Sequence, residues 1–115
     1  MDKKTILVVD DEIGIRQLTE MSLAGIGYNP IICENSEQAI PHISSADLLI
    51  TDLNMPGGIN GAELTKIAKR EKPNMPVIIM TGDPGDIPAD HLADKVICKP
   101  FEFEQLKEVI ADLLQ

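Results

Sequence analysis

The strongest indication of the fold is the stretch Thr5-Ile6-Leu7-Val8-Val9-Asp10-Asp11-Glu12, because a short apolar run ends there in three consecutive acids. Three later runs have the same form, and they are residues 48–51 before Asp52, residues 77–80 before Thr81, and residues 96–98 before Lys99. Short apolar runs bounded by polar residues are typical of strands buried on both faces of a parallel sheet. Reactive groups collect outside the carboxyl ends of such strands, so the four polar endings predict one common site.

Strand and helix patterns alternate five times along the chain, which predicts an α/β fold with a parallel sheet covered by helices on both faces. The predicted strands cover residues 5–9, 30–33, 47–51, 76–80 and 95–98. Between residues 83 and 94 the sequence is rich in acids and prolines, which leaves room only for a short helix from about Pro88.

The other helices are predicted from capping residues and apolar spacing. The first covers residues 13–26, and it places Ile15, Leu18, Ser22 and Ile26 near one face, a stripe that we interpret as core. The remaining helices are a short or kinked one that Asn35 or Ser36 can cap and that contains Pro41, one that begins with the capping box of Asn60 and Glu63, and one over residues 102–114.

The bulk composition predicts a single domain over residues 1–115 with an ordinary globular mixture, at 43% hydrophobic and 25% charged residues. The net charge of −9 argues against direct binding to nucleic acid, which needs a basic face. No apolar stretch approaches the roughly 20 residues that span a bilayer, and no signal peptide is evident, so we expect no membrane association and a cytoplasmic location. Cys33 and Cys98 lack metal-ligand spacing, and we interpret both as buried, unpaired thiols.

Asp10 and Asp11 predict a metal site. Two adjacent acids at the end of a buried strand repel each other, and a hard divalent cation resolves that repulsion through oxygen ligands. Mg²⁺ suits one or two carboxylates together with waters and a phosphate oxygen. A structural alternative is that the pair favours the dipole of the helix that follows.

Asp52, Thr81 and Lys99 predict the chemistry of the site. Asp52 either turns the chain or, beside other acids and a cation, acts as a nucleophile that forms an acyl phosphate. Lys99 needs a counter-charge at the end of a buried strand, and its ammonium can also pair with a phosphoryl oxygen. The Thr81 hydroxyl can donate a hydrogen bond to a bound oxyanion.

Taken together and in this order, the motifs resemble the receiver domain of two-component response regulators. The stretches that carry the resemblance are residues 6–12, Asp52-Leu53-Asn54-Met55-Pro56, Met80-Thr81-Gly82 and Lys99-Pro100-Phe101. The likeness covers essentially the whole chain. It implies a flavodoxin-like (βα)5 fold with five strands in the order 2-1-3-4-5.

The resemblance also implies a role for each site residue. Asp52 matches the phosphorylated aspartate, Thr81 the switch hydroxyl, and Lys99 the lysine that pairs with the phosphoryl group and precedes a cis proline. The implied Mg²⁺ ligands are Asp10, Asp11, Asp52 and the backbone carbonyl of Asn54. The donor in the family is a phosphohistidine on a histidine kinase or histidine phosphotransfer protein, and the switch alters affinity for a downstream effector domain or protein. Such a domain promotes only its own phosphorylation and dephosphorylation and is not otherwise an enzyme.

The chain departs from the family pattern in three places. The loop over residues 56–61 is one residue longer than usual, which predicts a looser connection after Asp52. The fourth helix is shortened, and Val96 stands where the family usually has an aromatic residue. We therefore expect an intact phosphorylation site beside an altered output surface.

Two rival functions fit part of this pattern. A degenerate receiver would act as a phosphorylation-independent docking or dimerisation module, which is consistent with the altered output surface. A Mg²⁺-dependent phosphatase of the haloacid dehalogenase type also uses an aspartate nucleophile. Such enzymes place a second aspartate two residues further on, where this chain has Asn54.

Overall fold

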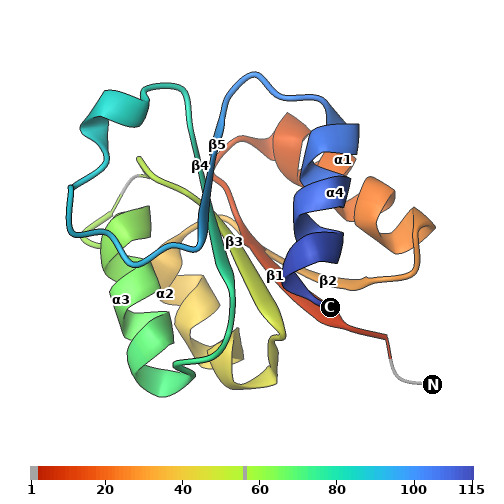
Figure 1. Cartoon of the computed structure of the whole chain (residues 1–115), viewed down its shortest axis with the longest axis horizontal. Helices are drawn as coiled ribbons and strands as arrows, with labels where there is room; N and C mark the ends of the chain where they lie inside the picture. The colour runs from red at the N-terminus through yellow and green to blue at the C-terminus, as the bar shows by residue number, and fades with distance from the viewer. Residues whose placement is uncertain (1–2, 56) are drawn as a thin grey trace.

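One five-stranded parallel sheet organises the fold, and the computed structural model describes residues 3–55 and 57–115. Its strands are β1 (Thr5–Val9), β2 (Asn29–Cys33), β3 (Leu48–Asp52), β4 (Val77–Thr81) and β5 (Lys95–Cys98). Neighbouring strands all pair in parallel in the order β2-β1-β3-β4-β5 (Figure 1). The predicted fold class and strand order are therefore confirmed, and every strand boundary lies within one residue of its predicted position.

Alternate side chains of β1 pack into two different core clusters, one on each face of the sheet. Leu7 and Val9 of β1 pack on the face covered by α2 (Ser36–Ala39) and α3 (Gly61–Glu71). Ile6 and Val8 pack on the opposite face, which α1 (Ile13–Gly25) and α4 (Phe103–Leu113) cover (Figure 1). All four of these β1 side chains are fully buried, which explains why the strand is a continuous apolar run.

Capping residues set the starts of α2 and α3 where the sequence predicts them. Asn60 Oδ1 accepts a hydrogen bond of 2.9 Å from the Glu63 N–H, and Glu63 Oε1 accepts one of 3.0 Å from the Asn60 N–H, which completes the capping box. Asn35 caps α2 through its side chain. The chain then continues through Pro41 as the 3-10 helix η1 (Ile40–Ser45), because proline cannot donate the next helical hydrogen bond.

The helix α1 turns a different face to the sheet from the one predicted. Its buried residues are Thr19 and Leu23, which lie four positions apart and so share one face. Leu18 is 64% exposed and Ile26 is 39% exposed, so the interpretation of their stripe as core is wrong. Leu23 fills the core against β1, whereas the stripe that contains Leu18 is rotated toward the segment that follows β5.

The crossover from β4 to β5 contains less helix than predicted. The 3-10 turn η2 (Pro84–Asp86) follows β4, and residues 87–94, all of which the structure describes, form no helix from Pro88. Asp94 Oδ2 instead accepts hydrogen bonds of 2.8 Å from the Val77 N–H and 2.7 Å from Lys69 Nζ. Charge-assisted bonds thus tie the end of the crossover to β4 and α3 without helical hydrogen bonds.

The two cysteines lie on opposite edge strands, and both are unpaired. Cys33 on β2 is buried as predicted, and burial raises the pKa of its thiol. Cys98 on β5 is exposed, so that part of the prediction is wrong; an edge strand with no helix in its crossover leaves the side chain in solvent. Among the described residues, none of the helices is long and apolar enough to cross a bilayer.

Candidate functional site

Lys99 lies at the centre of the candidate site, at the carboxyl ends of the strands. Its Nζ lies 3.2 Å from Asp10 Oδ2, 3.2 Å from Asp52 Oδ2 and 3.4 Å from Glu12 Oε1. Asp10 follows β1, Asp52 ends β3 and Lys99 follows β5, and parallel strands deliver their carboxyl ends to one edge of the sheet. The structure therefore brings these three predicted site residues together.

Asp10 is the most firmly held of the acids. Its side chain is fully buried, its N–H donates to the Cys33 carbonyl over 3.1 Å, and its Oδ1 accepts a 2.9 Å bond from the Glu12 N–H. Arg16 Nη1 donates a 2.8 Å hydrogen bond to the Asp10 carbonyl from the first turns of α1. These contacts from β2 and α1 fix the carboxylate that faces Lys99.

Burial controls the ionisation of Asp52. The residue is 8% exposed, and its Oδ1 accepts a 3.0 Å bond from the Leu53 N–H. Burial raises the pKa of Asp52 to about 6 against the attraction of Lys99, and Asp10 and Asp11 add smaller repulsions. Burial alone would lower the pKa of Lys99, but Asp10 and Asp52 outweigh it and raise that pKa. Asp52 is therefore mostly a carboxylate at neutral pH, paired with an ammonium.

Four carboxylates form a cluster that could hold a metal ion. Asp10, Asp11, Glu12 and Asp52 each offer one oxygen, and these oxygens lie within 4.8 Å of one another. When all four are ionised, the single ammonium of Lys99 leaves a net negative charge. A hard divalent cation with oxygen ligands suits both this donor set and this charge.

A cavity of about 390 Å³ opens over the cluster and includes the other predicted site residues. Asn54 and Thr81 both line it, together with Asp11, Asp52 and Lys99. The Thr81 hydroxyl is turned toward the crossover, where it accepts a 3.1 Å bond from the Asp83 N–H. The carbonyl of Thr81 accepts a 2.8 Å bond from the Lys99 N–H, and the Lys99–Pro100 peptide is cis as predicted.

Described residues of the loop after Asp52, which the sequence predicts to be looser than usual, contact neighbouring elements on two sides. Gly61 packs so closely that a Cβ atom there would overlap the Asp52 carbonyl oxygen, and its N–H donates a 2.8 Å hydrogen bond to the Leu53 carbonyl. Ser36 Oγ donates a 3.0 Å bond to the Ile59 carbonyl from α2. Pro56, which belongs to the motif after Asp52, lies outside the described residues. The described part of the longer loop is therefore tied to both β3 and α2.

Two contributors to the site were absent from the predictions. The sequence predicts no separate role for Glu12, yet its carboxylate both contacts Lys99 and joins the acidic cluster. Arg16 lies four residues further along α1, and its bond to the Asp10 carbonyl has no signature in the local sequence. Three acids in a row could have signalled Glu12, whereas nothing local distinguishes Arg16 from a surface arginine.

Comparison with known protein families shows which family the chain belongs to. A family model described as the response regulator receiver domain matches residues 6–111. This chain belongs to the response regulator receiver family. The resemblance predicted from the motifs is thus confirmed, and the domain is a component of two-component signalling.

Similar receiver sequences occur within longer proteins. The receiver domain is 33% identical to the probable transcriptional regulator ycf27 of Cyanophora paradoxa, with 100% of this chain and 50% of that protein covered. It is 39% identical over 83 residues to the DNA-binding transcriptional regulator NtrC of Salmonella typhimurium, with 70% of this chain and 18% of that protein covered. The chain therefore spans half or less of the length of these relatives.

Solved structures support the same fold. The response regulator protein TrrA of Thermotoga maritima, in complex with Mg(2+)-BeF, is 37% identical with a TM-score of 0.85, covering 96% of this chain and 99% of that one. A response regulator receiver protein from Sinorhizobium medicae has a TM-score of 0.90 over 98% of this chain and 95% of that chain. At 24% identity, the second likeness shows the fold alone.

Proposed function

We propose that residues 1–115 form one receiver domain that works as a phosphoacceptor switch, with Asp52 as the acceptor. The observation that carries this proposal is the position of Lys99, whose ammonium lies 3.2 Å from both Asp10 and Asp52 beside an open cavity. Phosphoryl transfer depends on positioning and charge stabilisation more than on covalent chemistry. An acceptor carboxylate, a cation site and a lysine that can pair with phosphoryl oxygens supply those needs.

Asp52 is the proposed nucleophile. Its carboxylate oxygen attacks the phosphorus of a partner phosphohistidine, the phosphorus–nitrogen bond breaks, and the electron pair of that bond returns to the imidazole. The pKa of about 6 leaves Asp52 mostly ionised at neutral pH, as this attack requires. Water later hydrolyses the acyl phosphate, so the domain promotes only its own phosphorylation and dephosphorylation and turns over no separate metabolite.

Mg²⁺ is the proposed cofactor. Its proposed ligands are Asp10, Asp11, Asp52 and the backbone carbonyl of Asn54. Support comes from the acidic cluster, which suits a hard cation, and from the similarity to a response regulator solved with Mg(2+)-BeF. When bound, the ion supplies neutralisation of charge on the phosphoryl oxygens.

Lys99 and Thr81 are the proposed switch residues. The Lys99 ammonium pairs with the Asp52 carboxylate before transfer and with a phosphoryl oxygen afterwards. The Thr81 hydroxyl, which now accepts a bond from the Asp83 N–H, turns toward the phosphoryl group. That rotation breaks the hydrogen bond with the Asp83 N–H and so changes the conformation of the crossover between β4 and β5. This switch therefore works without an aromatic residue at the position of Val96.

The proposed partners are a histidine kinase or histidine phosphotransfer protein as donor and a downstream effector domain or protein as receiver of the signal. With these partners, the proposed location of the phosphoryl transfer is the cytoplasm. With a net charge of −9, we propose no direct nucleic acid binding and no membrane binding by this domain.

Acetyl phosphate and mass spectrometry test the proposal. Incubation with acetyl phosphate and MgCl₂ is expected to add one phosphoryl group to the intact protein, and EDTA is expected to prevent the addition. Asp52→Asn should remain unmodified, whereas Glu20→Gln, an exposed carboxylate on α1, should be modified like the wild type. An adduct that persists in Asp52→Asn would refute the assignment of the acceptor.

A second candidate function is the phosphorylation-independent docking or dimerisation module. The curtailed crossover and Val96 favour it, because both lie where the switch must reach the surface. Amide NMR spectra recorded before and after acetyl phosphate separate the two functions. The switch predicts shifts through residues 83–94, whereas the docking module predicts changes confined to the site.

A further inference from the structure

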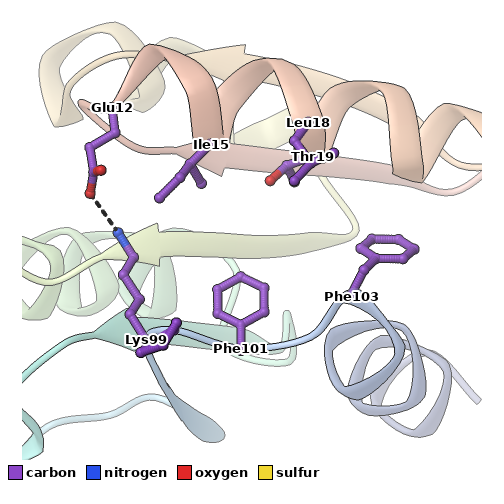
Figure 2. Close-up of a pocket in the computed structure, with 8 residues that line it drawn as sticks. Glu12, Ile15, Leu18, Thr19, Lys99, Phe101 and Phe103 are labelled. Atoms are coloured by element: carbon purple, nitrogen blue, oxygen red, sulfur yellow. Dashed lines mark hydrogen bonds and ion pairs between the residues drawn. The ribbon is translucent and has the colours of Figure 1, made fainter.

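A second cavity, of about 430 Å³, lies beside the site between α1 and the segment that follows β5. Figure 2 shows Ile15 and Leu18 of α1 on one side of it and the rings of Phe101 and Phe103 on the other. The Glu12–Lys99 ion pair closes one end. The volume falls within the range of small-molecule sites, which are mostly apolar with a few polar groups.

The charges at the closed end favour a cation over an anion. The side chain of Lys99 is only 15% exposed, and its ammonium already faces three carboxylates, so an incoming anion would meet those acids. The side chain of Glu12 is 60% exposed, and among the described residues Lys99, at 3.4 Å, is its one cationic partner. An ammonium group therefore matches the acid at this end, and an aromatic body matches the wall that the α1 side chains and the phenylalanine rings form.

We propose that this cavity binds a small molecule with an aromatic body and one ammonium group. The body would lie between Leu18 and the two phenylalanine rings, and the ammonium would pair with Glu12. Leu18, at 64% exposed, is the part of this wall with the most apolar surface to bury. Binding of this kind is independent of the proposed phosphorylation.

The cavity is also placed to regulate the site. Glu12 and Lys99 line both this cavity and the one over Asp52, so a bound ammonium would lie beside the acidic cluster. It would oppose the binding of Mg²⁺ there, and by linkage each ligand weakens the affinity of the other by the same factor. This second step, unlike the binding itself, rests on the proposed function.

Three probes of matched size test the binding by amide NMR titration in EDTA: 2-phenylethylamine, 2-phenylethanol and phenylacetate. The amine is expected to bind with a millimolar Kd or tighter, about fivefold more tightly than the alcohol, and phenylacetate more weakly than either. The shifts should cluster at residues 15–19 and 100–103. Equal affinity for all three probes, or shifts scattered over the surface, would overturn the proposal.

Matched variants separate specific pairing from general attraction to an acidic protein. Glu12→Gln should reduce the affinity for the amine to that for the alcohol, whereas Glu20→Gln makes the same charge change on α1 outside the cavity and should leave their ratio unchanged. Leu18→Asn should weaken amine and alcohol alike, and Met21→Asn, which alters a 73% exposed side chain outside the lining, should not. Leu18 and Met21 are both exposed, so we expect both asparagine variants to fold. Equal losses in Glu12→Gln and Glu20→Gln would refute pairing with Glu12.

Repeating the amine titration in saturating MgCl₂ tests the regulatory step. The affinity for the amine is expected to fall about fivefold or more. An unchanged affinity, with Mg²⁺ binding shown by its own shift titration, would overturn the coupling. Failure of Mg²⁺ to bind in that titration would instead count against the proposed function. It would not affect the proposal that the cavity binds an aromatic amine.

Discussion

Replacing Asp52 with asparagine should make the folded protein more stable at neutral pH, even though it removes the central carboxylate. Asparagine has nearly the same shape, and its Oδ1 can still accept the hydrogen bond from the Leu53 N–H. Lys99 keeps Asp10 and Glu12 as partners. What disappears is a buried negative charge that the fold holds at a cost, as the raised pKa of Asp52 shows.

The size of the effect follows from that pKa. A folded-state pKa of about 6, against an ordinary value of 3.8, corresponds to about 3 kcal/mol at full ionisation. Below about pH 4 the carboxyl is protonated in both folded and unfolded chains, so it adds no penalty. As the pH rises from about 4 to 6 the unfolded chain loses the proton first, and the stability of the wild type falls. The advantage of Asp52→Asn should therefore grow by about 3 kcal/mol across this window and level off above pH 7.

Urea denaturation at a series of pH values in EDTA measures this difference. The free energies of unfolding of wild type and Asp52→Asn are compared at each pH, so contributions from the other acids cancel. Glu20→Gln, which removes an exposed carboxylate from α1, should show little growth across the same window. If the difference for Asp52→Asn stayed flat with pH, or favoured the wild type at pH 7, the reasoning about burial would be refuted.

Three further predictions use the same denaturation assay. Lys99→Met removes the ammonium from between Asp10 and Asp52, so it should cost about 3 kcal/mol or more in EDTA, with part restored by MgCl₂; no loss would mean that the carboxylates need no counter-ion. Gly61→Ala should cost about 2 kcal/mol or more, because its Cβ would overlap the Asp52 carbonyl oxygen, whereas the added Cβ of Gly58→Ala has no atom of the described residues within 4 Å and should cost much less. Asn60→Ala should cost about 1 kcal/mol through loss of the capping box, and an unchanged midpoint would show that the cap is dispensable.

Local patterns in the sequence were sufficient to predict the frame of this domain. The apolar runs before Asp10, Asp52 and Thr81 are buried on both faces, so their composition marks strands regardless of which strands lie beside them. The caps at Asn35 and Asn60 act within a few residues, and so does the break at Pro41. The convergence of Asp10, Asp52 and Lys99 also follows, because parallel strands present their carboxyl ends at one edge.

Contacts between distant segments decided the rest. The face that α1 turns to the sheet depends on which side chains fit against β1, so Leu18 could be placed in solvent only by the packed helix. The end of the crossover after β4 is set by Asp94, which accepts hydrogen bonds from β4 and α3, two elements far from it in the sequence. The apolar cavity beside Lys99 exists only because α1 and the segment after β5 lie side by side. A residue's own neighbours determine its secondary structure, whereas its burial and partners depend on chain segments that only folding brings together.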